Sequence, residues 1–201
     1  PMLQHIIEKA KEDGFNNFII TTHYLNHIIE EHFRDGSEFG VNITYTHEKD
    51  PLGTAGALSL IDPKPDKPFI VTNGDVMTEV RFSDILDFHT NNDGIATMAI
   101  RQYELHHPFG VVDIKNSEVE SFEEKPIYYS YINAGVYVLN PEALSSLNKN
   151  EVCDMPTLLQ KNKSKNNKIT AYPMHESWID VGREEDLHSI RREGKYNKWN
   201  L

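Results

Sequence analysis

Segments with apolar residues at helical spacing alternate with short apolar runs along the first half of the chain. Leu3, Ile6, Ile7 and Ala10 recur on one helix face, and Gly14 follows as a stop signal. The same spacing predicts helices over residues 3–13, 27–33 and 55–60. Apolar or alternating runs predict strands over residues 18–22, 41–46 and 69–72. Helix and strand therefore alternate through this half.

The pattern changes in the second half. A helix over 84–90, which Ser83 can cap, and a strand over 95–100 continue the alternation. From Phe109 onward, β-like segments follow one another with no long helix between them, which predicts antiparallel or mixed strands at the sheet edge. These segments cover residues 110–114, 119–123 and 131–139. The remaining predictions are helices over 141–147, 155–162 and 184–194 and strands over 169–173 and 177–181.

This order of elements predicts an α/β fold. We expect a doubly wound, mostly parallel, Rossmann-like sheet with mixed edge strands and helices on both faces, which makes three layers, α/β/α. A length of 201 residues, with 38% hydrophobic and 25% charged residues, suits one globular domain. Since no repeat or flexible linker interrupts the sequence, residues 1–201 are taken as a single domain.

Charge and composition narrow the class of ligand. The formal net charge of -11 would repel a phosphate backbone, so we expect no nucleic-acid partner. No apolar run is long enough to cross a bilayer, and we expect a cytoplasmic protein with no membrane partner. The single cysteine, Cys153, cannot form an intrachain disulfide. These features favour a small-molecule ligand, and the sequence leaves a homo-oligomer open.

Two glycine-containing segments lie where α/β folds bind ligands. In the first, residues 52–57, the small residues would let backbone amides approach a ligand at a helix N-terminus, although a tight turn would need the same residues. In the second, a strand runs directly into Asn73, Gly74 and Asp75. A carboxylate at the C-terminal end of a strand is placed to hold Mg²⁺, although Asp75 would also suit a turn.

Three later segments carry further candidate side chains. Glu124 and Lys125 leave a short strand, where lysine can pair with a phosphate and the carboxylate can accept hydroxyl hydrogen bonds. Asn133 and Gly135 interrupt an apolar strand, which often marks close approach by a ligand or by backbone. Asp180 ends a strand before a glycine, and with Asp75 it would make a plausible Mg²⁺ site if the two converge.

Together these five segments, in this order from Leu52 to Arg183, resemble the sugar-1-phosphate nucleotidylyltransferase family across nearly the whole chain. The resemblance implies that a nucleoside triphosphate and a sugar 1-phosphate bind here, with Mg²⁺ held by Asp75 and Asp180. Lys125 would join these two acids as a catalytic residue. The implied nucleotide-binding residues are Leu52, Gly53, Thr54, Gly56, Asn73 and Gly74. The implied sugar-binding residues are Gly110, Glu124, Lys125, Asn133 and Gly135.

The sequence departs from the family's pattern at its start. The glycine-rich loop with an arginine that embraces the triphosphate should precede the first helix, and the chain opens instead on Pro1, Met2 and Leu3. We therefore expect the first strand and the signature loop to be missing from these 201 residues. The chain's brevity and the segment 153–156 are more similar to the mannose-1-phosphate and glucosamine-1-phosphate guanylyltransferase-like branch, which favours GTP.

Two other functions stay open at this point. One is a non-catalytic nucleotide-sugar-binding or regulatory domain, because a fold does not fix a function. The other is a GT-A-like glycosyltransferase, which shares the early order of strands and helices. Such enzymes usually carry an Asp-x-Asp metal motif, whereas Asp75 is followed by Val76 and Met77.

Overall fold

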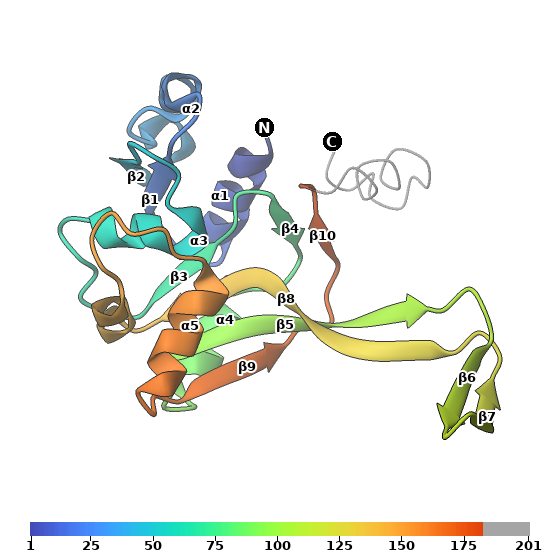
Figure 1. Ribbon diagram of the computed structural model, residues 1–201. Coiled ribbons are helices and arrows are strands. Elements are labelled where there is room, and N and C mark those ends of the chain that lie inside the picture. Colours follow the sequence, from blue (N-terminus) through green and yellow to red (C-terminus); the bar gives the residue numbers. More distant parts are fainter. Residues whose placement is uncertain (183–201) are drawn as a thin grey trace.

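The computed structural model describes residues 1–182 (Figure 1), and the helix expected over 184–194 lies outside them. The α-helices are α1 (Met2–Glu12), α2 (Asn26–Phe33), α3 (Gly53–Gly56), α4 (Phe82–Thr90) and α5 (Met155–Ser164), and the 3₁₀ helices are η1 (Ser37–Phe39), η2 (Ala57–Leu60) and η3 (Pro141–Ser146). None of the helices in this range has the length and apolar character needed to cross a bilayer.

The strands form one central sheet and three two-stranded pairs. They are β1 (Asn17–Thr22), β2 (Asn42–His47), β3 (Phe69–Thr72), β4 (Val76–Thr78), β5 (Ala96–His106), β6 (Val111–Lys115), β7 (Glu118–Glu123), β8 (Ile127–Leu139), β9 (Ile169–Pro173) and β10 (Trp178–Asp180). The central sheet has the order β3-β8-β5-β9, and the pairs are β1-β2, β4-β10 and β6-β7.

Strand directions confirm an α/β fold with mixed pairing. β1 with β2 and β5 with β9 are parallel, whereas β8 is antiparallel to both of its neighbours. Antiparallel pairings therefore have a larger share among the described strands than the predicted, mostly parallel sheet implied. The reason is the connection from β5 to β8, which returns through the β6-β7 hairpin, and a hairpin return makes strands antiparallel.

The central sheet is covered on both faces, which confirms the three layers. Along β8, Tyr137 and Leu139 pack into one core with α5 and η2, and Val136 and Val138 pack into a second core with α4 and α1. Because successive side chains of a strand point to opposite faces, these two cores lie on opposite sides of the sheet. A third, smaller core lies between the β1-β2 pair and helices α1 and α2.

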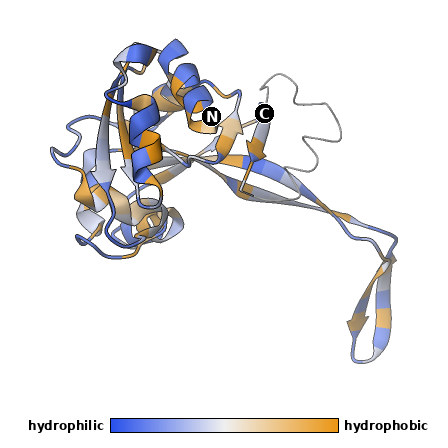
Figure 2. Ribbon diagram, turned by 90° about the horizontal axis from the view of Figure 1, so that it is seen from above, coloured by the Kyte–Doolittle hydropathy of each residue, from blue (hydrophilic) through white to orange (hydrophobic). Residues whose placement is uncertain are grey.

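β5 and β8 run past the sheet as a two-stranded arm. Both are longer than predicted, since β5 continues to His106 and β8 begins at Ile127. The arm projects away from the layered body in both views, with the β6-β7 hairpin at its tip (Figures 1 and 2). Most side chains of the arm are exposed, because no helix of the described chain covers it.

A buried polar network attaches α4 to the sheet. The imidazole of His89 lies between the hydroxyl of Thr97, 2.8 Å from Nδ1, and the amide oxygen of Asn140, 3.0 Å from Nε2. Thr97 also lies 2.7 Å from the hydroxyl of Thr170 on β9. The network thus connects a helix with neighbouring strands, and Thr97 is fully buried within it.

Thr97→Val tests the contribution of this network to stability. Valine keeps the shape but removes the hydroxyl, which leaves buried polar partners unsatisfied, so we expect the free energy of unfolding to fall by about 1–3 kcal/mol. Denaturant titration measures the change. Thr44→Val, on an exposed position of β2, should change stability by less than about 0.5 kcal/mol. Equal effects of the two substitutions would contradict the assigned role.

Candidate functional site

Asp75 and Asp180 converge on one glycine. A Cβ atom built at Gly182 would lie 2.9 Å from Oδ2 of Asp75 and 3.1 Å from Oδ1 of Asp180. The two carboxylates therefore face the same small volume, which a side chain at residue 182 would fill. Both aspartates are half-buried. The sequence analysis predicted a shared cation site only if Asp75 and Asp180 converge. In the structure the two side chains do converge.

Backbone hydrogen bonds between β4 and β10 and just beyond them hold the two acidic segments side by side. β10 pairs with β4 in an antiparallel register that sets Asp180 opposite Val76. Beyond the pair, the amide of Val181 donates to the carbonyl of Asp75 over 2.9 Å, and the amide of Gly182 donates to Oδ1 of Asp180 over 3.0 Å. One carboxylate thus follows β3 and the other ends β10, and the chain around Gly182 joins them.

A β-bulge in β8 lies beside the acidic pair. Met98 of β5 is opposite Tyr137, but Ile100 is opposite Asn133, so β8 has extra residues at this point. Gly135 has a φ of +72°, a left-handed conformation that glycine adopts without strain. Oδ1 of Asn133 accepts a hydrogen bond from the amide of Gly135 over 3.1 Å. The side chain of Asn133 thereby stabilises the bulge.

The bulge presents two successive carbonyl groups to the acidic segments. The carbonyl of Gly135 accepts a hydrogen bond from the amide of Asn73 over 2.9 Å, and the carbonyl of Ala134 accepts one from Nε1 of Trp178 over 2.8 Å. A Cβ at Gly135 would lie 3.0 Å from Nδ2 of Asn73. Glycine is therefore required here by close packing as well as by its backbone angle.

The contact of Asn133 with sugar hydroxyls stays a prediction, and in the structure its side chain has two protein partners. Besides the bond to Gly135, Nδ2 of Asn133 donates to the hydroxyl of Tyr137. Burial raises the pKa of that tyrosine, so its hydroxyl stays protonated. Sequence reasoning also missed Trp178 as a partner of β8. Its position two residues before Asp180 was the available signal.

The glycine segment at residues 52–56 packs against another part of the chain. The amides of Ala55 and Gly56 both donate to the carbonyl of Cys153 over 2.9 Å, and a Cβ at Gly53 would lie 2.6 Å from Oδ1 of Asp154. The small residues are therefore needed for internal packing. Contact with a nucleotide stays a prediction, and the exposed Gly53 and Thr54 are the residues of the segment that face solvent.

Cys153 belongs to this packing. The side chain is 2% exposed and lies in the core beneath α5. Burial raises the pKa of its thiol, which keeps the neutral form and opposes nucleophilic reactivity. We therefore assign Cys153 a structural role, which agrees with the absence of a basic residue beside it in the sequence.

The predicted sugar-binding residues fall into two separate groups. Gly110, Glu124 and Lys125 lie together at the base of the β6-β7 hairpin, where Glu124 approaches Gly110 and pairs with Lys125 at 4.0 Å. Asn133 and Gly135 lie at the other end of the arm, beside Asn73. The stretch of β8 from residue 127 to 133 alone spans about 20 Å. The structure therefore does not bring Lys125 to the acidic pair.

Comparison with known proteins identifies the family. A family model described as "Nucleotidyl transferase" matches residues 1–195. The chain belongs to the nucleotidyl transferase family. The mannose-1-phosphate guanyltransferase of Yarrowia lipolytica is 31% identical over 201 residues, covering 94% of this chain and 54% of that protein. The probable mannose-1-phosphate guanylyltransferase 3 of Oryza sativa subsp. japonica is 33% identical over 199 residues, covering 92% and 54%. The chain thus spans about half the length of these curated relatives.

A solved structure confirms the fold of this nucleotidyl transferase chain. The putative glucose-1-phosphate thymidylyltransferase from Bacillus anthracis, crystallised with a sucrose, superposes with a TM-score of 0.74 at 24% sequence identity. The match covers 97% of this chain and 82% of that one. At this level of identity, the likeness supports the shared α/β architecture.

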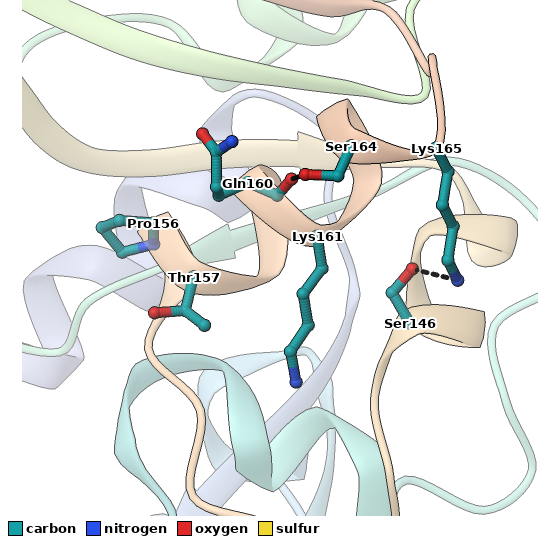
Figure 3. A pocket seen from close by; sticks show the side chains of 7 residues that line it. All are labelled: Ser146, Pro156, Thr157, Gln160, Lys161, Ser164 and Lys165. Atoms are coloured by element: carbon teal, nitrogen blue, oxygen red, sulfur yellow. Dashed lines mark hydrogen bonds between the residues drawn. The ribbon is translucent and has the colours of Figure 1, made fainter.

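Two cavities of this nucleotidyl transferase chain differ in their relation to the acidic pair. The larger, of about 680 Å³, lies on the surface of α5 (Figure 3). It is lined by Ser146, Pro156, Thr157, Gln160, Lys161, Ser164 and Lys165. Its lysines already pair with Glu151 and Ser146, and none of the expected site residues in the described chain lines it. The smaller, of about 400 Å³, lies between α1 and β4 and reaches Val76, next to Asp75.

Gly182→Ala tests the convergence of the two carboxylates. The added methyl group would lie within contact distance of both, so it should push them apart and weaken binding of Mn²⁺, a stand-in for Mg²⁺, by about tenfold. Electron paramagnetic resonance of free Mn²⁺ gives the dissociation constant. Gly74→Ala is the matched control, because a Cβ at Gly74 meets nothing within 4 Å. Unchanged Mn²⁺ affinity in Gly182→Ala would show that the carboxylates do not share a cation.

Proposed function

We propose that this chain is part of an enzyme that joins a sugar 1-phosphate to a nucleoside triphosphate, giving a nucleotide-diphosphate sugar and pyrophosphate. The observation that carries the proposal is the convergence of Asp75 and Asp180 beside Gly182 in a member of the nucleotidyl transferase family. Relatives named as mannose-1-phosphate guanyltransferases support GTP and mannose 1-phosphate as substrates. The proposal includes a cytoplasmic location.

The donor set at the acidic pair fits Mg²⁺. Mg²⁺ favours one or two carboxylates together with phosphate oxygens and water, and the space at Gly182 is free of a side chain. Asp75 and Asp180 would hold the ion, which supplies positive charge against the triphosphate. The two aspartates are the residues of this chain to which we assign metal binding, and their half-buried setting limits competition from solvent.

The reaction needs positioning and charge neutralisation more than a protein nucleophile. A phosphate oxygen of the sugar 1-phosphate forms a bond to the α-phosphorus of the triphosphate, and the bond from that phosphorus to the β-phosphate oxygen breaks, releasing pyrophosphate. Transfer of this kind depends on orienting the two substrates and on neutralising their oxygens. The raised thiol pKa of Cys153 is consistent with a mechanism that uses no cysteine.

The arm supplies the sugar-phosphate contact in this proposal. The side chain of Lys125 is 66% exposed, so it is available to a ligand. Because Lys125 lies far from the acidic pair in the structure, its contact with the sugar phosphate requires the arm to move toward the body.

Pyrophosphate release by the complete natural protein tests the proposed reaction. With GTP, mannose 1-phosphate and Mg²⁺ we expect turnover, and Asp75→Asn or Asp180→Asn should lower kcat by about a hundredfold or more, because charge neutralisation at the phosphates is lost. Lys67→Ala, on the loop before β3, is a control that should keep activity. Binding without pyrophosphate release would favour a non-catalytic domain, and glycosyl transfer from a nucleotide sugar would favour a glycosyltransferase.

Lys125→Ala tests the role of the arm. Losing a charge-assisted contact to the sugar phosphate costs about 1.5–3 kcal/mol, so the KM for mannose 1-phosphate should rise roughly ten- to a hundredfold while the KM for GTP changes little. Steady-state kinetics with each substrate varied in turn gives both constants. Lys115→Ala, in the hairpin and paired with Glu120, is the matched control. An unchanged sugar KM in Lys125→Ala would remove this lysine from the site.

A further inference from the structure

The β4-β10 pair is too short to hold its own register. Each strand has three residues, and the pair forms a sheet separate from the central one. Two-stranded pairs are marginally stable on their own, so this one depends on contacts outside itself. The dependence matters for the site, because Asp180 ends β10 and Asp75 directly precedes β4.

Trp178 connects β10 to the central sheet. Its Nε1 donates to the carbonyl of Ala134 over 2.8 Å, within the bulge of β8, and its ring packs into the core that contains Val76 and Val136. The neighbouring carbonyl, of Gly135, accepts the amide of Asn73. Two adjacent carbonyl groups of one bulge therefore hold the strand that carries Asp180 and the turn that carries Asp75.

We propose that Trp178 is a positioning residue for the acidic pair, acting through its indole hydrogen bond to Ala134. The bond fixes β10 along β4. A slip of two residues keeps the same side chains facing the core but moves Asp180 by about 6–7 Å, too far to share a cation with Asp75. The inference rests on the proposed cation site and names the residue that assembles it.

A residue that served the core alone would affect stability without a specific effect on the cation. Tyr172 provides that comparison, because it packs against the same core and is likewise half-buried. Trp178→Phe keeps an aromatic ring and removes the indole donor, whereas Tyr172→Phe keeps a ring and removes a hydroxyl. Both substitutions keep an aromatic ring against the same core, although Trp178→Phe removes more volume than Tyr172→Phe, and they differ in their relation to Ala134, because the hydrogen bond to its carbonyl belongs to Trp178.

Mn²⁺ binding, followed by electron paramagnetic resonance on the complete natural protein without nucleotide, separates the two roles. We expect the Kd for Mn²⁺ to rise about tenfold in Trp178→Phe, as for partners that orient metal ligands, and to stay within about twofold of wild type in Tyr172→Phe. Equal affinity in Trp178→Phe and wild type would overturn the positioning role, as would an equal loss of affinity in both variants.

Failure of the cation site itself gives a different result. If the wild-type protein does not bind Mn²⁺, or if Asp75→Asn and Asp180→Asn bind it as tightly as wild type, the proposed cation site is wrong and the positioning role with it. If both aspartate variants lose binding and Trp178→Phe does not, the proposed cation site stands and this inference alone is wrong.

Indole hydrogen exchange in the unmutated protein gives a second measurement, independent of whether Trp178→Phe folds. The 201 residues contain two tryptophans, Trp178 and Trp199, and resonance assignment identifies the indole N–H signal of Trp178. Because coupling between a cation and its positioning contact is reciprocal, Mg²⁺ should slow exchange of the Trp178 indole signal severalfold, and Asp180→Asn should abolish the effect. Exchange of this signal unchanged by Mg²⁺, at a concentration that saturates the site, would overturn the proposal.

Discussion

The arrangement of the site depends on the β-bulge at residues 133–135 of β8. Gly135 adopts a left-handed conformation that the side chain of Asn133 stabilises, and this turns the carbonyls of Ala134 and Gly135 toward Trp178 and Asn73. In a regular strand these carbonyls would accept hydrogen bonds from the amides of a neighbouring strand. By departing from the ladder at one point, β8 holds two chain segments that are about a hundred residues apart in sequence.

The same strand has two different environments on the two sides of this bulge. From Val136 to Leu139 β8 is fully buried between two helical layers, and from Ile127 to Tyr131 it is exposed in the arm. The acidic pair lies beside the point where the environment changes. This arrangement suits a site that binds both a cation and a polar substrate. The buried part of β8 fixes the positions of the acidic side chains, and the exposed arm leaves its polar side chains open to a substrate.

Sequence reasoning predicted the elements and the acidic pair for a physical reason. Burial makes apolar spacing follow the period of each element. Asp75 and Asp180 were candidates because each follows or ends a predicted strand, but they meet through the separate β4-β10 pair and not at the rim of the central sheet. The partners of Asn133, Trp178 and Gly53 could not be predicted, because their hydrogen bonds and packing join distant segments. The separation of Lys125 from the acids follows from the length of the arm. The spacing of apolar residues predicted shorter strands, 95–100 and 131–139, than the observed β5 and β8.

The central claim is that Asp75 and Asp180 hold one cation between them. A crystal of the complete natural protein, grown with Mn²⁺ and a non-hydrolysable GTP analogue, tests it directly through anomalous scattering. The account predicts a single anomalous peak beside Gly182, about 2.0–2.3 Å from an oxygen of each aspartate, with phosphate oxygens completing the coordination. A peak bound by one aspartate alone, or by neither, would contradict it.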